Sequence, residues 1–600
     1  MAVHLLTPQD RVVGMQGLPD GYFEARVEAV GEGDRYMYVI DGSKERPDPA
    51  SRWQPEGVHG PSAVVSGAFD WQDGGWFGVP LSRYVIYELH VGTFSGEGTF
   101  EAVIPRLDAL RELGITAVEL MPVAQFPGER NWGYDGVYPF AVQDSYGGVR
   151  GLKRLVDACH ARGMAVIADV VYNHLGPEGN YLWDYGPYFT SRYKTPWGDA
   201  VNFDGEGSDH VRRYFIESAL MFQQEYHVDA LRVDAVHAIH DQSARPFLQE
   251  LQEVLQEAAL RANRRFHVIA ESDLNDPRVI RDRRLGGMGL DAQWSDDFHH
   301  GLHALLTGES DGYYADFGSM TLLAEALRHG YAYTGQVSAY RKRRHGAPPW
   351  GCEPGQFVVC AQNHDQVGNR MMGERLASLV SFEAVKTALA CVGLSPFVPL
   401  LFMGEEYGET APFLYFVSHG DAELLAAVRR GRREEFAAFR DRGEPPDPGA
   451  PATFEGSRLR WERREEGRGA VLVRFVRRVL ELRRTCKALS AARVDRMVVT
   501  SSEQDKTLVV VRSVGRRHAL WAVNFGNERA SVDVEAPAGT WDSALDSSAP
   551  AWSEQAVPSD TAGEPSERRT TSTLGCRLSV GMAPRSVQVW TKTPAPEAEE

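Results

Sequence analysis

Four short apolar runs, each ending in side chains that can do chemistry, decide the fold of this chain. They read AVIADVVYNH (165–174), VDALRVDAVH (228–237), FHVIAESDLND (266–276) and FVVCAQNHDQVGN (357–369). Apolar runs of this length, bounded by polar clusters, are typical of strands buried on both faces of a parallel sheet. Carboxylates and histidines just past several strand ends favour a barrel of parallel strands, which gathers such residues at its C-terminal rim.

Outside these runs, the chain from about residue 84 alternates between strand and helix patterns. Helical spacing at 104–114 and 152–163 ends in Gly, where a helix C-cap is expected. Strict alternation predicts a (β/α)8 TIM barrel rather than an open sheet. The connection at 277–290 is short for a helix. The eight candidate strands are 84–90, 117–122, 165–171, 230–233, 267–271, 292–294, 357–362 and 397–403.

Two all-β regions flank the predicted barrel. Residues 1–82 alternate apolar and polar positions between turn signals, which predicts an N-terminal β-sandwich of a carbohydrate-binding kind. Residues 83–490 form the predicted catalytic barrel, and residues 491–600 a C-terminal β-sandwich. Two long insertions, 175–207 and 404–451, follow strand ends, where a barrel builds its specificity.

Composition excludes several classes of protein. The formal net charge of −18 argues against nucleic acid or an anionic membrane as the main partner. No segment approaches the roughly 18 apolar residues of a membrane helix, and no secretory signal is visible. The six cysteines lie far apart, which indicates buried free thiols and favours a cytoplasmic location. The basic run RKRRH (341–345) is interpreted as a solvated loop or, alternatively, as a wall of a substrate groove.

The rim carboxylates suit the cleavage of an acetal. That reaction needs one carboxylate near the anomeric carbon and one carboxylic acid near the bridging oxygen. The neighbouring fourth and fifth strands supply Asp234 and Glu271, and Arg232 shares a strand face with Asp234 and would hold it ionised. Capping of strands, pairing with arginine or binding of a structural ion is the alternative for any single carboxylate. The convergence of acid, base, Arg and His on four segments favours catalysis.

These segments resemble the four signature regions of the α-amylase superfamily of glycoside hydrolases. The resemblance implies that Asp234 is the nucleophile, Glu271 the general acid/base, and Asp365 a ligand of the ring hydroxyls at the cleavage point. It further implies that Arg232 orients Asp234 and that Asp169 is structural. His174 and His364 would hydrogen-bond the same sugar, and Tyr134 would stack under its ring. The matching motifs are DVVYNH (169–174), LRVDAVH (231–237), AESD (270–273) and QNHD (362–365).

Within that superfamily, the chain is most similar to the trehalose-releasing enzymes. The stretches at 48–62, 87–95, 172–190 and 402–409 carry this similarity. It implies hydrolysis of the α-1,4 bond next to the terminal trehalose of a maltooligosyl trehalose, and a separate enzyme that makes the trehalose end. A glucan branching enzyme with the same catalytic trio is the alternative, and a non-catalytic glucan-binding barrel is a remote one.

Some positions depart from the family pattern. His237 and Ala238 stand where many amylases have a Lys-His pair that touches the leaving sugar, so we expect a different leaving-group side with His237 as a substrate contact. Tyr340 and Arg341 are predicted walls of the trehalose pocket. Asn173 matches a calcium ligand of many amylases, but the wider calcium-binding pattern is missing. We therefore expect no cofactor and no required metal.

Overall fold

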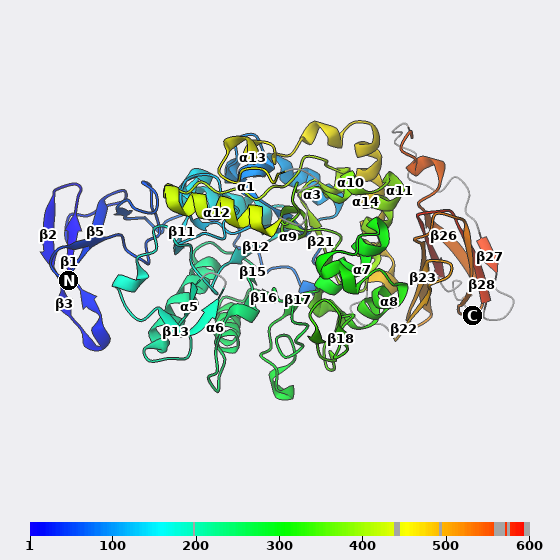
Figure 1. Cartoon of the computed structure of the whole chain (residues 1–600), viewed down its shortest axis with the longest axis horizontal. Helices are drawn as coiled ribbons and strands as arrows, with labels where there is room; N and C mark the ends of the chain where they lie inside the picture. Colours follow the sequence, from blue (N-terminus) through cyan, green and yellow to red (C-terminus); the bar gives the residue numbers. More distant parts are fainter. Residues whose placement is uncertain (196–197, 437–443, 491–494, 557–569, 573–576, 593–600) are drawn as a thin grey trace.

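The computed structural model describes residues 1–195, 198–436, 444–490, 495–556, 570–572 and 577–592. Its centre is a closed barrel of eight parallel strands, in the order β12-β15-β16-β17-β20-β21-β8-β9 (Figure 1). The (β/α)8 barrel is confirmed, with a strand at each of the eight expected places. The strands are β8 (Ile86–Leu89), β9 (Ala117–Leu120), β12 (Ala165–Val170), β15 (Ala230–Val233), β16 (His267–Ala270), β17 (Ala292–Trp294), β20 (Phe357–Cys360) and β21 (Val398–Phe402).

Helices follow most of the barrel strands. The connection between β16 and β17 lies wholly in the described residues and holds only the short 3-10 turn η7 (Arg283–Leu285), as its length predicted. Helix α4 ends at His160, three residues before Gly163, because a turn with Gly163 at a φ of 73° leads out of it. The main helices are α3 (Leu107–Leu113), α4 (Gly148–His160), α5 (Ser208–Gln224), α6 (Phe247–Arg261), α7 (Asp296–Thr307), α8 (Met320–His329), α11 (Phe382–Leu394) and α14 (Gly467–Thr485).

The barrel interior changes from apolar to polar along the strands. Ile86, Ala117 and Ile167 belong to an apolar cluster near the strand starts. Two positions further along the same strands, and so on the same side, lie Glu88, Glu119 and Asp169, which are all buried. Arg232 of β15 pairs in register with Asp169 of β12, and Glu88 with Glu119. The strands thus carry a buried layer of charged groups directly below the rim.

Sheets cover the two ends of the elongated molecule (Figure 1). At the N-terminal end, the order is β2-β1-β5-β6, and β7 pairs with β5. At the C-terminal end, a sheet of order β22-β23-β24-β29-β26-β27 lies with the pair β25-β28. The flanking sheet domains are confirmed, whereas the boundaries at 82 and 490 stay predictions and residue 491 lies outside the described residues. These strands are β1 (Ala2–Leu5), β2 (Arg11–Gly14), β5 (Arg35–Ile40), β6 (Lys44–Arg46), β7 (Ser62–Ala63), β22 (Arg496–Ser502), β23 (Thr507–Val514), β24 (Arg517–Asn524), β25 (Ala530–Glu535), β26 (Thr540–Asp546), β27 (Thr570–Ser572), β28 (Arg577–Met582) and β29 (Ser586–Lys592).

The two long insertions form their own structure above the strand ends. The first contains a hairpin of β13 (Phe189–Thr195) and β14 (Gly198–Val201). The second contains helix α12 (Ala422–Glu435), and part of it, residues 437–443, lies outside the described residues. No helix in the described part of the chain has the length and apolar character needed to cross a membrane.

Candidate active site

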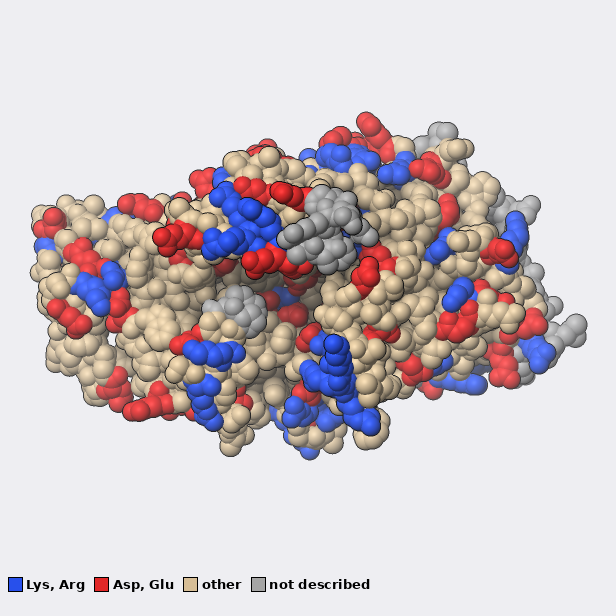
Figure 2. Space-filling model, in the orientation of Figure 1, with Lys and Arg blue, Asp and Glu red and all other residues tan. Residues whose placement is uncertain are grey.

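A cavity of about 500 Å³ opens at the C-terminal ends of the barrel strands. Figure 2 shows the surface hollowed near the middle of this face, with acidic side chains inside the hollow. Three strands deliver the predicted catalytic trio to the same cavity, since the carboxyl ends of parallel strands meet at one rim. The predicted site residues in its lining are Tyr134, His174, Asp234, His237, Glu271 and Asp365.

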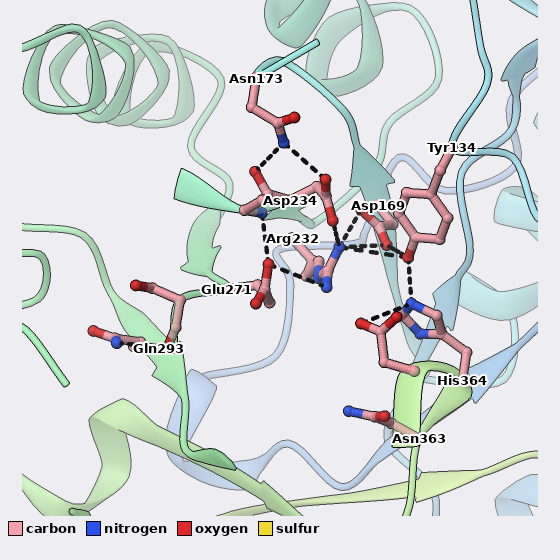
Figure 3. Close-up of polar contacts among 12 residues, drawn as sticks. Tyr134, Asp169, Asn173, Arg232, Asp234, Glu271, Gln293, Asn363 and His364 are labelled. Carbon is pink, nitrogen blue, oxygen red and sulfur yellow. Dashed lines mark hydrogen bonds and ion pairs between the residues drawn. The ribbon is translucent and has the colours of Figure 1, made fainter. Parts of the chain in front are cut away.

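Asp234 is held as a carboxylate by donors on both of its oxygens. Arg232 Nη1 donates to Oδ1 at 2.7 Å, and Asn173 Nδ2 donates to Oδ2 at 2.7 Å (Figure 3). Burial by itself would raise the pKa of Asp234, but the Arg232 guanidinium, His174 and the Asn173 amide together bring that pKa below its usual value. The side chain is 11% exposed, so an ionised oxygen faces the cavity.

Arg232 is the fully buried cation at the centre of the site. Its Nη1 donates to both oxygens of Asp169, at 3.0 and 2.9 Å, and its Nη2 lies 3.8 Å from Glu271 Oε2. The guanidinium also lies over the Trp294 ring, 4.5 Å from its centroid. One cation is therefore shared among three carboxyl groups, Asp169, Asp234 and Glu271.

Glu271 is a largely buried carboxyl whose pKa is raised. Its Oε2 accepts a hydrogen bond of 2.6 Å from the backbone N–H of Ala235, next to Asp234. Burial, and then the negative charges of Asp234 and Asp365, raise the pKa of Glu271 to about 7, against the opposing pull of Arg232. Two neighbouring carboxyls thus differ in protonation near neutral pH, which is how glycosidases obtain a nucleophile and an acid from similar side chains.

Asp365, His364 and Tyr134 form the far side of the site. The Asp365 side chain is 40% exposed and lies 3.3 Å from His364 Nε2. Tyr134 stacks on the His364 ring, with centroids 5.2 Å apart, and its hydroxyl is 2.7 Å from both His364 Nε2 and Asp169 Oδ2. Burial lowers the pKa of His364, but Asp365 and Glu88 outweigh it and raise that pKa to about 9. His364 is therefore an imidazolium at neutral pH.

The remaining contacts on the cavity wall differ in burial. His174 is buried, its Nε2 faces the backbone oxygen of Tyr134 at 3.0 Å, and burial lowers its pKa. His237 is exposed at the cavity edge. Asn173 uses its amide nitrogen on Asp234 and its amide oxygen on the His174 ring. In the described part of the chain, no cluster of three or more His, Cys, Asp or Glu side chains has the geometry to hold a metal ion.

Tyr340 and Arg341 lie beside the cavity rather than in its lining. The Tyr340 side chain is 48% exposed. Arg341 Nη2 donates to Asp273 Oδ2 at 2.9 Å, two residues beyond Glu271. Lys342, Arg343 and Arg344 of the same basic run are exposed, whereas His345 is buried and Arg343–Arg344 form the short strand β19, so the solvated-loop interpretation holds for only part of the run. The role of these residues as walls of a trehalose pocket stays a prediction.

Sequence reasoning missed part of the cavity wall and its support. Helix α12 contributes Val428, Gly431 and Arg432 to the lining, and its charged sequence gives no signal of this. Asp296, at the start of α7, has a pKa raised well above its usual range by burial and then by Glu271. Glu88 contacts His364, and a glutamate inside the apolar strand YVIYELHV was a signal that could have identified it.

Comparisons with known proteins agree with this geometry. The family model for the alpha amylase catalytic domain matches residues 73–195. A malto-oligosyltrehalose trehalohydrolase from Saccharolobus solfataricus is 51% identical over 74% of this chain and 77% of its own length. A solved structure of a candidate alpha amylase from Salmonella typhimurium has a TM-score of 0.86 and 37% identity, and the match covers 99% of this chain and 95% of that one.

The branching-enzyme alternative has weaker support. A 1,4-alpha-glucan branching enzyme from Corynebacterium efficiens is 26% identical over 65% of this chain and 55% of its own length. The trehalohydrolase relative is twice as similar and matches more of both chains. With a catalytic barrel, two unequal rim carboxyls and these relatives, the chain belongs to the malto-oligosyltrehalose trehalohydrolases of the α-amylase family of glycoside hydrolases.

Proposed function

We propose that this chain hydrolyses the α-1,4-glucosidic bond next to the terminal trehalose of maltooligosyl trehalose, with retention of configuration. The products are trehalose and a maltodextrin shortened at that end. The observation that carries the proposal is the difference between the two central carboxyls. Asp234 has a lowered pKa and Glu271 a pKa of about 7, and one guanidinium contacts both.

In the proposed first step, Asp234 attacks the anomeric carbon of the sugar at the cleavage point. Glu271 gives its proton to the bridging oxygen as the carbon–oxygen bond breaks, so trehalose leaves as a neutral alcohol. A retaining mechanism requires the two carboxyls to lie about 5–5.5 Å apart, and contact of both with Arg232 supports such closeness. The result is a covalent glycosyl ester on Asp234.

In the second step, water replaces trehalose on the leaving-group side. Glu271, now ionised, takes a proton from that water, and the oxygen attacks the anomeric carbon and releases Asp234. Asp365, Tyr134 and the His364 imidazolium would hold the hydroxyls and flattened ring of the sugar through both steps. Asp365 and Tyr134 line the cavity, and His364 is buried behind them in contact with both, which supports this division of labour.

Product analysis with two matched substrates tests the proposal. Maltotriosyl trehalose and maltopentaose have the same number of glucose units, but only the first ends in trehalose. We expect rapid release of free trehalose from the first and much slower cleavage of the second. Equal rates would indicate an amylase-like specificity, and new α-1,6 branches without net hydrolysis would indicate a branching enzyme.

The proposed substrate implies a second enzyme, because something must convert the reducing end of a maltodextrin into the α,α-1,1 linkage. We therefore propose functional coupling to such an enzyme. A cytoplasmic location is also proposed, because the five described cysteines are free, as expected in a reducing compartment. Co-expression with such an enzyme should convert maltodextrin to trehalose, whereas this chain alone should not.

A further inference from the structure

A buried glutamate on β8 binds His364 from below the site. The Glu88 side chain is fully buried, and its Oε2 accepts the backbone N–H of His364 at 3.0 Å. Its Oε1 contacts His364 Nδ1. The two residues are separated by 276 positions in the sequence. One carboxylate thus fixes both the backbone and the ring of His364.

The hydrogen bonds around the ring require a proton on each ring nitrogen. Tyr134 has a single hydroxyl proton, and it is donated to Asp169 Oδ2, while both oxygens of Asp169 accept from Arg232 Nη1. The Tyr134 oxygen then accepts from His364 Nε2. Since Nδ1 faces Glu88, both ring nitrogens act as donors, as they do only in the imidazolium.

The charged groups around His364 come from several elements. Glu88 contacts Nδ1, and Asp365 and Tyr134 face Nε2. More distant groups act on the ring through space: His90 after β8, Glu119 on β9, Asp169 on β12 and Arg232 on β15. The rings of Trp132 and Trp294 complete the surroundings, with centroids 5.8 and 6.1 Å away. Glu88 is the carboxylate that touches the side of the ring remote from substrate.

The neighbouring Glu119 is a buried glutamate without the histidine partner that Glu88 has in His364. The two glutamates are paired in register on adjacent strands and are both fully buried. Neither carboxyl oxygen of Glu119 has a hydrogen-bond partner among the described residues. Burial, and then the charges of Glu88 and Asp169, raise the pKa of Glu119 well above its usual range, so Glu119 is neutral. Of the two glutamates, only Glu88 contacts His364.

We propose that Glu88 is a positioning residue for the glycosidase reaction, which holds His364 as an oriented imidazolium so that its Nε2–H is aimed at Tyr134 and Asp365, the two residues that line the sugar-binding cavity in front of it. This inference rests on the proposed function, since it assigns a support to the sugar-binding wall. Glu88 itself does not line the cavity and so does not touch substrate. It acts on catalysis through His364.

The test substitutes Glu88→Gln and, as a matched control, Glu119→Gln. Both changes replace a buried glutamate by its amide in the same layer of the barrel, but only the first alters a side chain that contacts His364. We expect kcat/KM at pH 7 to fall about 10- to 100-fold for Glu88→Gln, with most of the loss in kcat, and to change little for Glu119→Gln. Glu88→Asp keeps the charge and should recover part of the loss.

The pH dependence separates positioning from a structural role. The charge on His364 is present below its pKa of about 9, so it persists through neutral pH in the native enzyme. In Glu88→Gln the contribution of Glu88 is lost while that of Asp365 remains, so the pKa of His364 should fall and activity should decline from a lower pH than in the native enzyme. Lost packing alone would reduce activity equally at every pH.

The titration of His364 provides a readout that does not need substrate. Imidazole resonances of the histidine-labelled enzyme, assigned with a His364→Gln variant, should show His364 protonated at pH 7.5 in the native chain and a lower pKa of His364 in Glu88→Gln. A neutral His364 in the native enzyme would overturn the inference, even if no Glu88 variant folds. An unchanged pH profile in folded Glu88→Gln would also overturn it. Failure of trehalose release by the native enzyme would instead contradict the proposed function.

Discussion

Both ends of the barrel carry a cluster of Asp, His and Arg side chains. Only the cluster at the C-terminal rim contains a carboxyl group, Glu271, that can donate a proton near neutral pH. The rim cluster comprises Arg232, Asp234, Glu271, His364 and Asp365. The lower cluster lies at the N-terminal ends of the strands and comprises Asp73, His160, His227, Asp229 and Arg264, beside a smaller cavity of about 270 Å³. The compositions are similar, but the balance of charge differs.

In the lower cluster, Asp73 faces three basic side chains and shares one of them, His160, with Asp229. Asp73 Oδ2 lies 2.9 Å from His160, 2.8 Å from His227 and 3.1 Å from Arg264. Burial would raise the pKa of Asp73, but these partners hold it far below its usual value. Trp76 stacks on His160 and donates to Asp229 at 2.6 Å, which ties the segment before the barrel to its lower face.

At the rim, one arginine serves three carboxyls, so the charges do not balance. Asp234 obtains the direct hydrogen bond, whereas Glu271 lies 3.8 Å away and keeps a pKa of about 7. Burial and the negative charges of Asp234 and Asp365, which Arg232 offsets only in part, keep the proton on Glu271. The lower cluster is accordingly a structural clamp, and four experiments test this distinction.

The largest effect should come from Asp234→Asn, compared with Asp229→Asn at the other end of the barrel. We expect the rim variant to lose about four orders of magnitude or more in kcat, because a neutral amide cannot form the glycosyl ester. The lower variant should retain kcat but lose about 1–3 kcal/mol of unfolding free energy, because His160 keeps only one of its two buried carboxylate partners, Asp73. The rate of trehalose release measures kcat, and urea unfolding measures the free energy of unfolding. Comparable kcat values for the two variants would contradict the distinction between a catalytic rim cluster and a structural lower cluster.

The next effect concerns Glu271→Gln. Since Glu271 must be protonated to act as the acid, kcat/KM of the native enzyme should fall about tenfold per pH unit above pH 7, the value near which its pKa lies. The Gln variant should lose this alkaline limb and about 10²- to 10⁴-fold in kcat on the natural linkage. An aryl glycoside, whose leaving group needs no proton, should restore the first step. A native profile flat through pH 9 would contradict the assignment.

The third effect is on stability alone. Asp73→Asn removes the charge that faces two histidines and an arginine, and it should lower the free energy of unfolding by about 3–5 kcal/mol without changing kcat. Because the pKa of Asp73 is depressed, its contribution is present above the unfolded-state pKa of about 4 and is lost only in strong acid. Asp70→Asn, an exposed change in the same segment, is the control. Reduced activity in folded Asp73→Asn would refute a purely structural role.

The smallest effect should come from Arg341→Ala. Arg341 binds Asp273 just beyond Glu271, so its removal should loosen the leaving-group side of the rim without altering the catalytic charges. We expect kcat/KM for maltotriosyl trehalose to fall about tenfold, equivalent to about 1.4 kcal/mol, with little change for maltopentaose. Arg343→Ala, on the same loop and exposed, serves as the control. An equal fall in kcat/KM on both substrates would show that Arg341 does not contribute to recognition of the trehalose unit.

The amino-acid sequence alone determined the barrel, the flanking sheets and the members of the rim cluster. These follow from local patterns: apolar runs of strand length, helical spacing between them, and acids or histidines placed directly after each run. A barrel brings such residues to one rim whatever the details of its packing. The strand β15 (Ala230–Val233), which contains Arg232 and is followed directly by Asp234, was therefore predictable from a few adjacent residues.

Only the tertiary structure decided how the charges are shared. The contacts of Glu88 with His364, of Asp73 with His160 and of Arg232 with Asp169 join residues 276, 87 and 63 positions apart, and no local pattern specifies them. The wall formed by α12 depends likewise on where a long insertion folds back. A pKa reflects burial and the sum of nearby charges, which exist only in the folded chain. The sequence therefore identified the acids, whereas the fold decided which of them keeps its proton.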